Sequence, residues 1–98
     1  GPRDWGLLYH VYEIIKHDVS GGTDDYKALQ AVTPPGMTWP ELDRHVGRFR
    51  GTANDPAHAG PEARHGRPEP NPISDPMSLR EAEDLIRRLL EAWIDTKI

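Results

Sequence analysis

The sequence predicts an all-α protein: a small bundle of three to four helices, with a long Pro/Gly-rich loop before the C-terminal helix. Apolar residues recur at three- and four-residue steps in several segments, which is the period of an amphipathic helix. A helix-capping signature, Ser or Thr followed three residues later by Glu, occurs twice. No segment shows the alternation of a strand. The 98 residues suit a single domain, 1–98, with a modest core.

The first helix is predicted from Asp4 to Val19. Asp4 is a suitable N-cap, and Gly21-Gly22 is a suitable stop. Trp5 and Tyr12 flank the apolar stripe that we expect to face the core. The stripe comprises Leu7, Leu8, Val11, Ile14, Ile15 and Val19.

A short second helix is predicted within residues 23–32, because Tyr26, Leu29 and Val32 are three residues apart. Pro34-Pro35-Gly36 ends it.

The third helix begins with a capping box, Thr38-Trp39-Pro40-Glu41. Met37 and Leu42 can form a hydrophobic staple around this box. We expect the helix to end near residues 51–54. Its predicted apolar face comprises Trp39, Leu42, Val46 and Phe49.

Residues 54–77 form the long loop, which contains six prolines and no aromatic residue. Loops of this length in small domains are usually functional or disordered. The C-terminal helix is predicted over 78–97, opens with a second capping box from Ser78 to Glu81, and is expected to be the main stabiliser. Glu83–Arg87 and Asp84–Arg88 are favourable i,i+4 pairs. Its apolar face comprises Ala82, Leu85, Ile86, Leu89, Leu90, Trp93 and Ile94.

Charge and composition narrow the classes of function. The net charge of −4 argues against wholesale nucleic-acid binding. Cysteine is absent, which excludes disulfides and thiolate metal sites and suits a cytoplasmic location. No apolar run reaches the length of a membrane span, so we expect no membrane association. Gly1-Pro2 is typical of the residues left by a tag protease, so the natural sequence is expected to start near Arg3. The chain could be a whole protein or a domain of a longer one.

Residues 44–67 form a basic patch in this acidic chain, with five arginines against two acidic residues. Guanidinium groups bind phosphate through a planar fork of donors, so the patch could bind RNA. The alternative is a solvated helix face followed by a polar loop, which composition favours. The candidate binding residues are Arg44, Arg48, Arg50, Arg64 and Arg67.

Histidines offer two further candidate sites. His10, Glu13 and His17 share one side of the first helix, but His10 and His17 lie about 10 Å apart along it, too far to hold one ion. We therefore expect no metal and no cofactor. The segment from Asn54 to His58 either caps the third helix or joins a polar site with Arg50 and Arg64-His65.

An Asn-x-x-x-His turn, a polar loop and a final helix opening Ser-Leu-x-Glu-Ala-Glu together resemble the HEPN superfamily, most closely its small bacterial members. The resemblance covers residues 51–58 and 77–93, about a quarter of the chain, and the first helix is compatible with it. It implies a small all-α bundle that often dimerises, acting either as a metal-independent ribonuclease or as an inactive interaction module.

The catalytic pattern of the HEPN family is an Arg, four to six residues and then a His, near the start of the final helix. Arg50 and His58 are further apart than this pattern, and Arg64 and His65 are adjacent. Arg3 and His10 have the spacing but lie at the other end of the chain. The departure favours the interaction module over the nuclease.

The sequence therefore predicts a non-enzymatic helical protein-interaction domain, of a bacterial defence or toxin–antitoxin type. Its expected partner is another protein or a second copy of itself. The alternative is a HEPN-like metal-independent ribonuclease or RNA-binding module. That alternative would use Arg50, Asn54, His58, Arg64 and His65.

Overall fold

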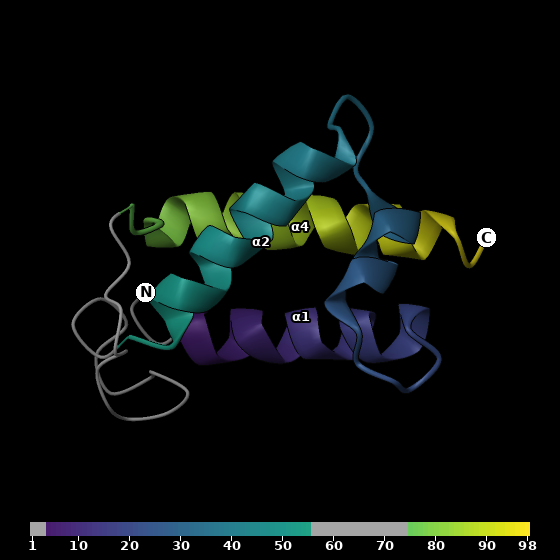
Figure 1. The fold of residues 1–98 in the computed structure, drawn as a ribbon, viewed down its shortest axis with the longest axis horizontal. Coiled ribbons are helices and arrows are strands. Elements are labelled where there is room, and N and C mark those ends of the chain that lie inside the picture. Colours follow the sequence, from purple (N-terminus) through teal and green to yellow (C-terminus); the bar gives the residue numbers. More distant parts are fainter. Residues whose placement is uncertain (1–3, 56–74) are drawn as a thin grey trace.

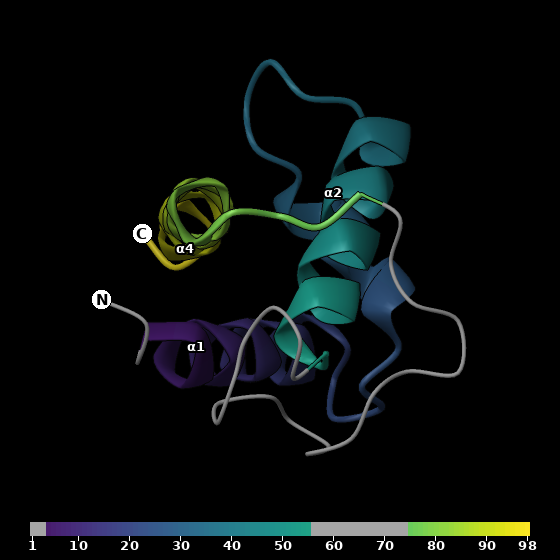
Figure 2. The same cartoon turned by 90° about the vertical axis from the view of Figure 1, so that its left-hand side faces the viewer.

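Two long helices lie side by side and run in the same direction in the computed structural model: α1 (Asp4–Val19) and α4 (Leu79–Asp95) (Figures 1 and 2). A third helix, α2 (Trp39–Ala53), crosses one face of this pair. A short 3-10 helix, η1 (Tyr26–Val32), contacts both α1 and α4. The structure describes residues 4–55 and 75–98, and its regular elements there are all helices. The predicted all-α bundle is confirmed.

Helix α1 has the predicted bounds and ends at the predicted glycines. The Gly22 amide donates to the His17 carbonyl at 2.9 Å, and the Gly21 amide donates to the Asp18 carbonyl at 3.1 Å. This pair of bonds is the Schellman arrangement, which needs a left-handed residue after the helix. Gly21 supplies it with φ of 64°.

The buried face of α1 differs from the predicted stripe. Leu7 is 61% exposed and Ile14 is 45% exposed, whereas Tyr12 and Ile15 are fully buried. Trp5 and Tyr9 are also buried, so aromatic rings form most of the core face. The helix is apolar around most of its circumference, and its periodicity fits two adjacent faces. The larger aromatic side chains and Ile15 occupy the core, whereas Leu7 and Ile14 of the predicted stripe are exposed.

The predicted short helix is present as η1. Asp25 caps it by accepting a hydrogen bond from the Lys27 amide at 3.0 Å. The three-residue spacing of Tyr26, Leu29 and Val32 matches the three residues per turn of a 3-10 helix. Leu29 and Val32 are buried, so this spacing points both side chains into the core.

Both capping boxes form as predicted. Glu41 accepts from the Thr38 amide at 3.0 Å, and Glu81 accepts from the Ser78 amide at 3.1 Å. These bonds hold the pKa of each glutamate below its ordinary value. Each Ser or Thr hydroxyl accepts from its glutamate's amide in return. The start of each long helix that follows a loop is therefore fixed by local sequence.

Helix α4 buries most of its predicted face. Ala82, Leu85, Ile86 and Leu89 are buried, whereas Ile94 is 45% exposed. The polar side differs in detail from the prediction. Arg87 pairs with Asp84 at 2.6 Å and with Glu91 at 2.7 Å, rather than with Glu83.

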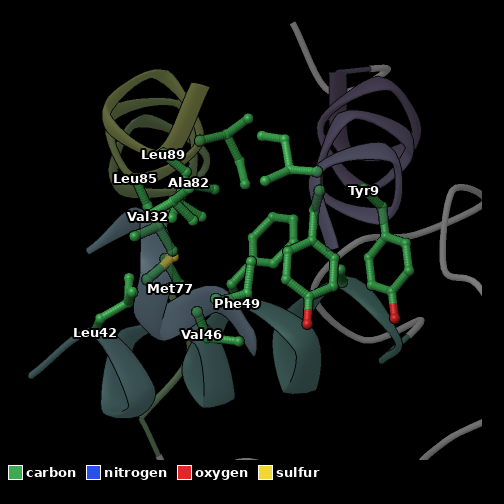
Figure 3. Packing of buried hydrophobic residues seen from close by; sticks show 14 of the residues in the cluster. Tyr9, Val32, Leu42, Val46, Phe49, Met77, Ala82, Leu85 and Leu89 are labelled. Carbon is green, nitrogen blue, oxygen red and sulfur yellow. The ribbon is translucent and has the colours of Figure 1, made fainter. Parts of the chain in front are cut away.

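Phe49 of α2 lies at the centre of the core. Its ring stacks on Tyr9 at a centroid distance of 5.7 Å and meets Tyr12 edge-on at 5.5 Å. Trp5 stacks on it at 6.1 Å. Figure 3 shows Leu42 and Val46 of the same helix on the side that faces Leu85 and Leu89. Helix α2 therefore joins α1 to α4 through one apolar face.

Candidate functional site

The predicted site residues separate into two groups. Arg44, Arg48 and Arg50 lie on α2, and Asn54 follows its last turn. The remaining members of the predicted site lie outside the described residues. These are His58, Arg64, His65 and Arg67.

Arg48 is engaged within the protein rather than extended into solvent. Its side chain is only 16% exposed. The guanidinium donates to the backbone carbonyls of Asp75 and Pro76 at 3.1 and 3.2 Å, and to the Glu81 carboxylate at 3.1 Å. It also pairs with the Asp75 carboxylate at 3.1 Å. Its donors are thus used to hold the segment that leads into α4.

Thr52 completes this attachment one turn further along α2. Its buried hydroxyl accepts a hydrogen bond from the Met77 amide at 2.8 Å. Arg48 and Thr52 therefore bind the consecutive residues 75–77, directly before α4. We call these contacts the Arg48–Thr52 clasp. It sets the position of α4 against α2.

Arg50 is exposed and lies beside two aromatic residues. Its guanidinium carbon lies 5.9 Å from the centroid of the Tyr26 ring, which is a cation–π distance. It also lies near Tyr12, whose fully buried hydroxyl has no hydrogen-bond partner among the described residues. Burial raises the pKa of Tyr12 to about 12, although the Arg50 charge opposes this rise. Tyr12 is therefore neutral at physiological pH.

Asn54 ends α2, as one of the two interpretations of the sequence expected. Its amide donates to the Arg50 carbonyl at 3.1 Å. Its side chain is buried, and its carbonyl oxygen has no partner within residues 4–55 and 75–98. Asp55, which follows, is also buried. Arg50, Asn54 and Asp55 thus gather at one end of α2.

The helix face with His10, Glu13 and His17 does not form a metal centre. Within the described parts of the chain, no three His, Asp or Glu side chains are placed to hold an ion. His17 instead contacts Asp24 at 3.3 Å.

A groove lies between α1 and α4, and α2 contributes none of its lining. Its first part has a volume of about 670 Å³ and is lined by Leu7, Leu8 and Val11 of α1. Ile86 and Leu90 of α4 form the opposite apolar wall. Arg80, Glu83, Asp84 and Arg87 also contribute to its lining. This part combines an apolar floor with charged side chains.

The groove continues along the C-terminal halves of the same helices. This second part has a volume of about 540 Å³, and Ile14 and Trp93 are its large apolar residues. The indole N–H of Trp93 donates to the Asp18 carboxylate at 2.8 Å, and Lys97 donates to it at 2.6 Å. These two bonds lower the pKa of Asp18. The polar lining here is mainly histidine and acidic: His10, Glu13, His17, Asp18 and Asp24.

The sequence interpretation missed two features of these sites. It did not place Tyr12 and Tyr26 beside Arg50, because aromatic residues that are distant along the chain have no local signal of contact. It assigned Leu7, Val11 and Ile14 to the core, whereas they line the groove. Residues 5–15 are almost continuously apolar. This pattern indicates that the helix has two apolar faces, one that packs in the core and one that lines the groove.

In the part of the chain that the structure describes, no helix is long and apolar enough to cross a bilayer. Comparison with known proteins found no matching family model, no matching curated protein and no matching solved structure.

Proposed function

We propose that the chain is a non-enzymatic helical protein-interaction domain that binds its partner through the groove between α1 and α4. The observation that carries this proposal is the exposure of Leu7 and Ile14, at 61% and 45%, which line the groove on α1. Large apolar side chains exposed along a groove of a small protein are typical of interaction sites. The HEPN resemblance, the bacterial defence or toxin–antitoxin role and the cytoplasmic location stay predictions.

The chemistry of the groove supports a protein partner. An apolar centre with a polar rim is the usual anatomy of a protein–protein interface. Leu7, Leu8 and Val11 supply the centre on α1, while Arg80 and Glu83 supply part of the rim on α4. An amphipathic helix is the partner element that best fits a groove between two helices.

We expect Leu7→Glu to abolish partner binding, because it places a charge in the apolar centre of the groove. Tagged chain is incubated with a lysate of the cells that encode it, and retained proteins are compared between variants. Ile98→Glu is the matched control, since Ile98 is 97% exposed and does not line the groove. Circular dichroism verifies that both variants are folded. An identical set of retained proteins with Leu7→Glu would contradict the proposal.

The second candidate function is RNA binding or cleavage at the end of α2, and Arg50 favours it. Its guanidinium is exposed and lies against the Tyr26 ring, beside Tyr12. An arginine next to aromatic rings can contact phosphate and stack on unpaired bases. Arg48 adds little to this candidate, because the clasp uses its donors.

We expect the purified domain not to cleave RNA. Structured and single-stranded RNA are incubated at low salt with the wild type and with a His58→Ala, His65→Ala double variant. Cleavage that disappears in the double variant would overturn the non-enzymatic proposal, and equal cleavage by both would indicate a contaminant. Salt-sensitive binding that is lost in Arg50→Ala but kept in Arg44→Ala would place the domain in the RNA-binding class.

A further inference from the structure

We propose that the chain binds a Cu(I) ion in the cavity between α2 and the N-terminal half of α4. The ligands are the thioethers of Met37 and Met77 and the imidazole of His45. This inference goes beyond the proposed function and does not depend on it. Three observations support it: the kind of donors that line the cavity, the way the fold holds them, and the charges around them.

The donors that line this cavity are those that a soft metal ion prefers. The chain has two methionines, and both line the same cavity of about 120 Å³ together with His45. Thioether sulfur and imidazole nitrogen are typical ligands of Cu(I), whereas Mg²⁺ and Ca²⁺ take oxygen ligands. The expectation that the chain binds no metal concerned histidine and carboxylate ligands on α1, and it did not include these sulfur atoms.

The fold anchors both methionines at equivalent positions. Met37 and Met77 each lie directly before the N-cap of a capping box. The Arg48–Thr52 clasp also holds the main chain of Met77 against α2, since the Thr52 hydroxyl accepts from the Met77 amide at 2.8 Å. The side chain of Met77 is buried in the core cluster (Figure 3). Ligands on a backbone that is already fixed lose little freedom when they bind an ion.

His45 supplies the third ligand from the face of α2 that carries the clasp. It lies three residues after the buried Leu42 and three before Arg48, which binds the residues directly before α4. His45 is half-buried, and its imidazole has no hydrogen-bond or ion-pair partner among the described residues. The imidazole is therefore available to an ion in the cavity.

The charges around the cavity favour a monovalent soft ion. Glu81 and Asp84 also line it, but Arg48 binds the Glu81 carboxylate at 3.1 Å and Arg87 binds the Asp84 carboxylate at 2.6 Å. A hard ion would have to displace these arginines, whereas a soft ion binds the thioethers without displacing them. Arg88 lines the cavity as well, and its repulsion of a cation is half as large for Cu(I) as for a divalent ion.

Proton NMR tests the two sulfur ligands directly, because the chain has only two methionine ε-methyl groups. Cu(I) is added to the purified chain under anaerobic conditions with ascorbate, and Met37→Leu and Met77→Leu assign the two signals. Cu(I) is expected to shift both methyl signals of the wild type, since coordination withdraws electron density from the sulfur. A shift of neither signal, or of one alone, would overturn the site.

Competition with a chromophoric Cu(I) chelator measures the affinity. Met37→Leu, Met77→Leu and His45→Gln are each expected to raise the Kd for Cu(I) by at least about tenfold, because each removes one ligand. His10→Gln is the matched control, since His10 lies on α1 outside the cavity, and it is expected to keep the wild-type Kd. Leucine is close to methionine in volume, and circular dichroism without metal verifies that the variants are folded. A Kd that rises equally in His10→Gln and His45→Gln would remove His45 from the site.

Discussion

Replacing Phe49 with alanine is expected to cost about 3–5 kcal/mol of the free energy of unfolding, the usual range for a fully buried aromatic residue. Phe49 is completely buried and contacts the rings of Trp5, Tyr9 and Tyr12. Each aromatic pair contributes about 0.5–1.5 kcal/mol beyond its buried area, so the loss lies toward the upper end of the range. Small domains have only about 5–15 kcal/mol in total, so the variant is expected to be marginally folded.

Urea unfolding followed by tryptophan fluorescence measures this loss, with Trp5 as a reporter beside the altered site. Gly47→Ala is the matched control in the same helix. An added Cβ at Gly47 meets no atom of the described residues within 4 Å, so this change is expected to stabilise the helix by about 0.5–1 kcal/mol. A Phe49→Ala variant that unfolds at the wild-type urea concentration would show that α2 does not join the two long helices as described.

Helix boundaries were predictable because their causes are local. The capping boxes at Thr38 and Ser78 and the stop at Gly21 each depend on residues within one turn. The same is true of η1, because its three-residue spacing predicts a short helix, although it does not by itself say that the helix is of the 3-10 type. Such signals do not depend on what the rest of the chain does.

The orientation of α1 was not predictable in the same way. Its apolar residues surround most of the helix, and periodicity alone cannot say which face the rest of the chain covers. The α1 face that carries Tyr9 and Tyr12 packs against Phe49 of α2. The adjacent face, which carries Leu7 and Ile14, therefore lines the groove. Four members of the predicted stripe, Leu7, Leu8, Val11 and Ile14, therefore line the candidate interaction surface, whereas Ile15 is buried in the core. A helix with more apolar faces than its own domain can cover is a sequence signal of an interface.

Arg48 illustrates the second limit of sequence reasoning. It lies one turn from Arg44, which is the spacing of two arginines on a solvated basic face. Nothing in the local sequence distinguishes the partly buried Arg48 from the exposed Arg44. Its partners, Asp75, Pro76 and Glu81, lie 27 to 33 residues further along the chain. Only the fold brings them together. The candidate binding role of Arg48 weakens for this reason, whereas Arg44 remains exposed.

Arg48→Met is expected to lower the free energy of unfolding by about 1–3 kcal/mol, because it removes hydrogen bonds from a charged donor while keeping the apolar stem. Arg48→Lys is expected to recover little of this loss, since an ammonium cannot reach several acceptors in the planar geometry of a guanidinium. Hydrogen exchange at the Met77 amide is expected to speed up in both variants, because Arg48 and Thr52 hold the same segment.

Arg44→Met is the matched control, one turn away on the same helix and exposed, and is expected to stay within about 0.5 kcal/mol of the wild type. A double-mutant cycle with Glu81→Gln separates the contributions, because the glutamine oxygen keeps the capping box while the charge and the oxygen that accepts from Arg48 are lost. The coupling is expected to be smaller than the whole effect of Arg48→Met, since two of the acceptors are the backbone carbonyls of Asp75 and Pro76. If Arg44→Met and Arg48→Met lower the free energy of unfolding equally, the clasp does not hold α4 in place. Arg48 would then again be a candidate binding residue beside Arg50.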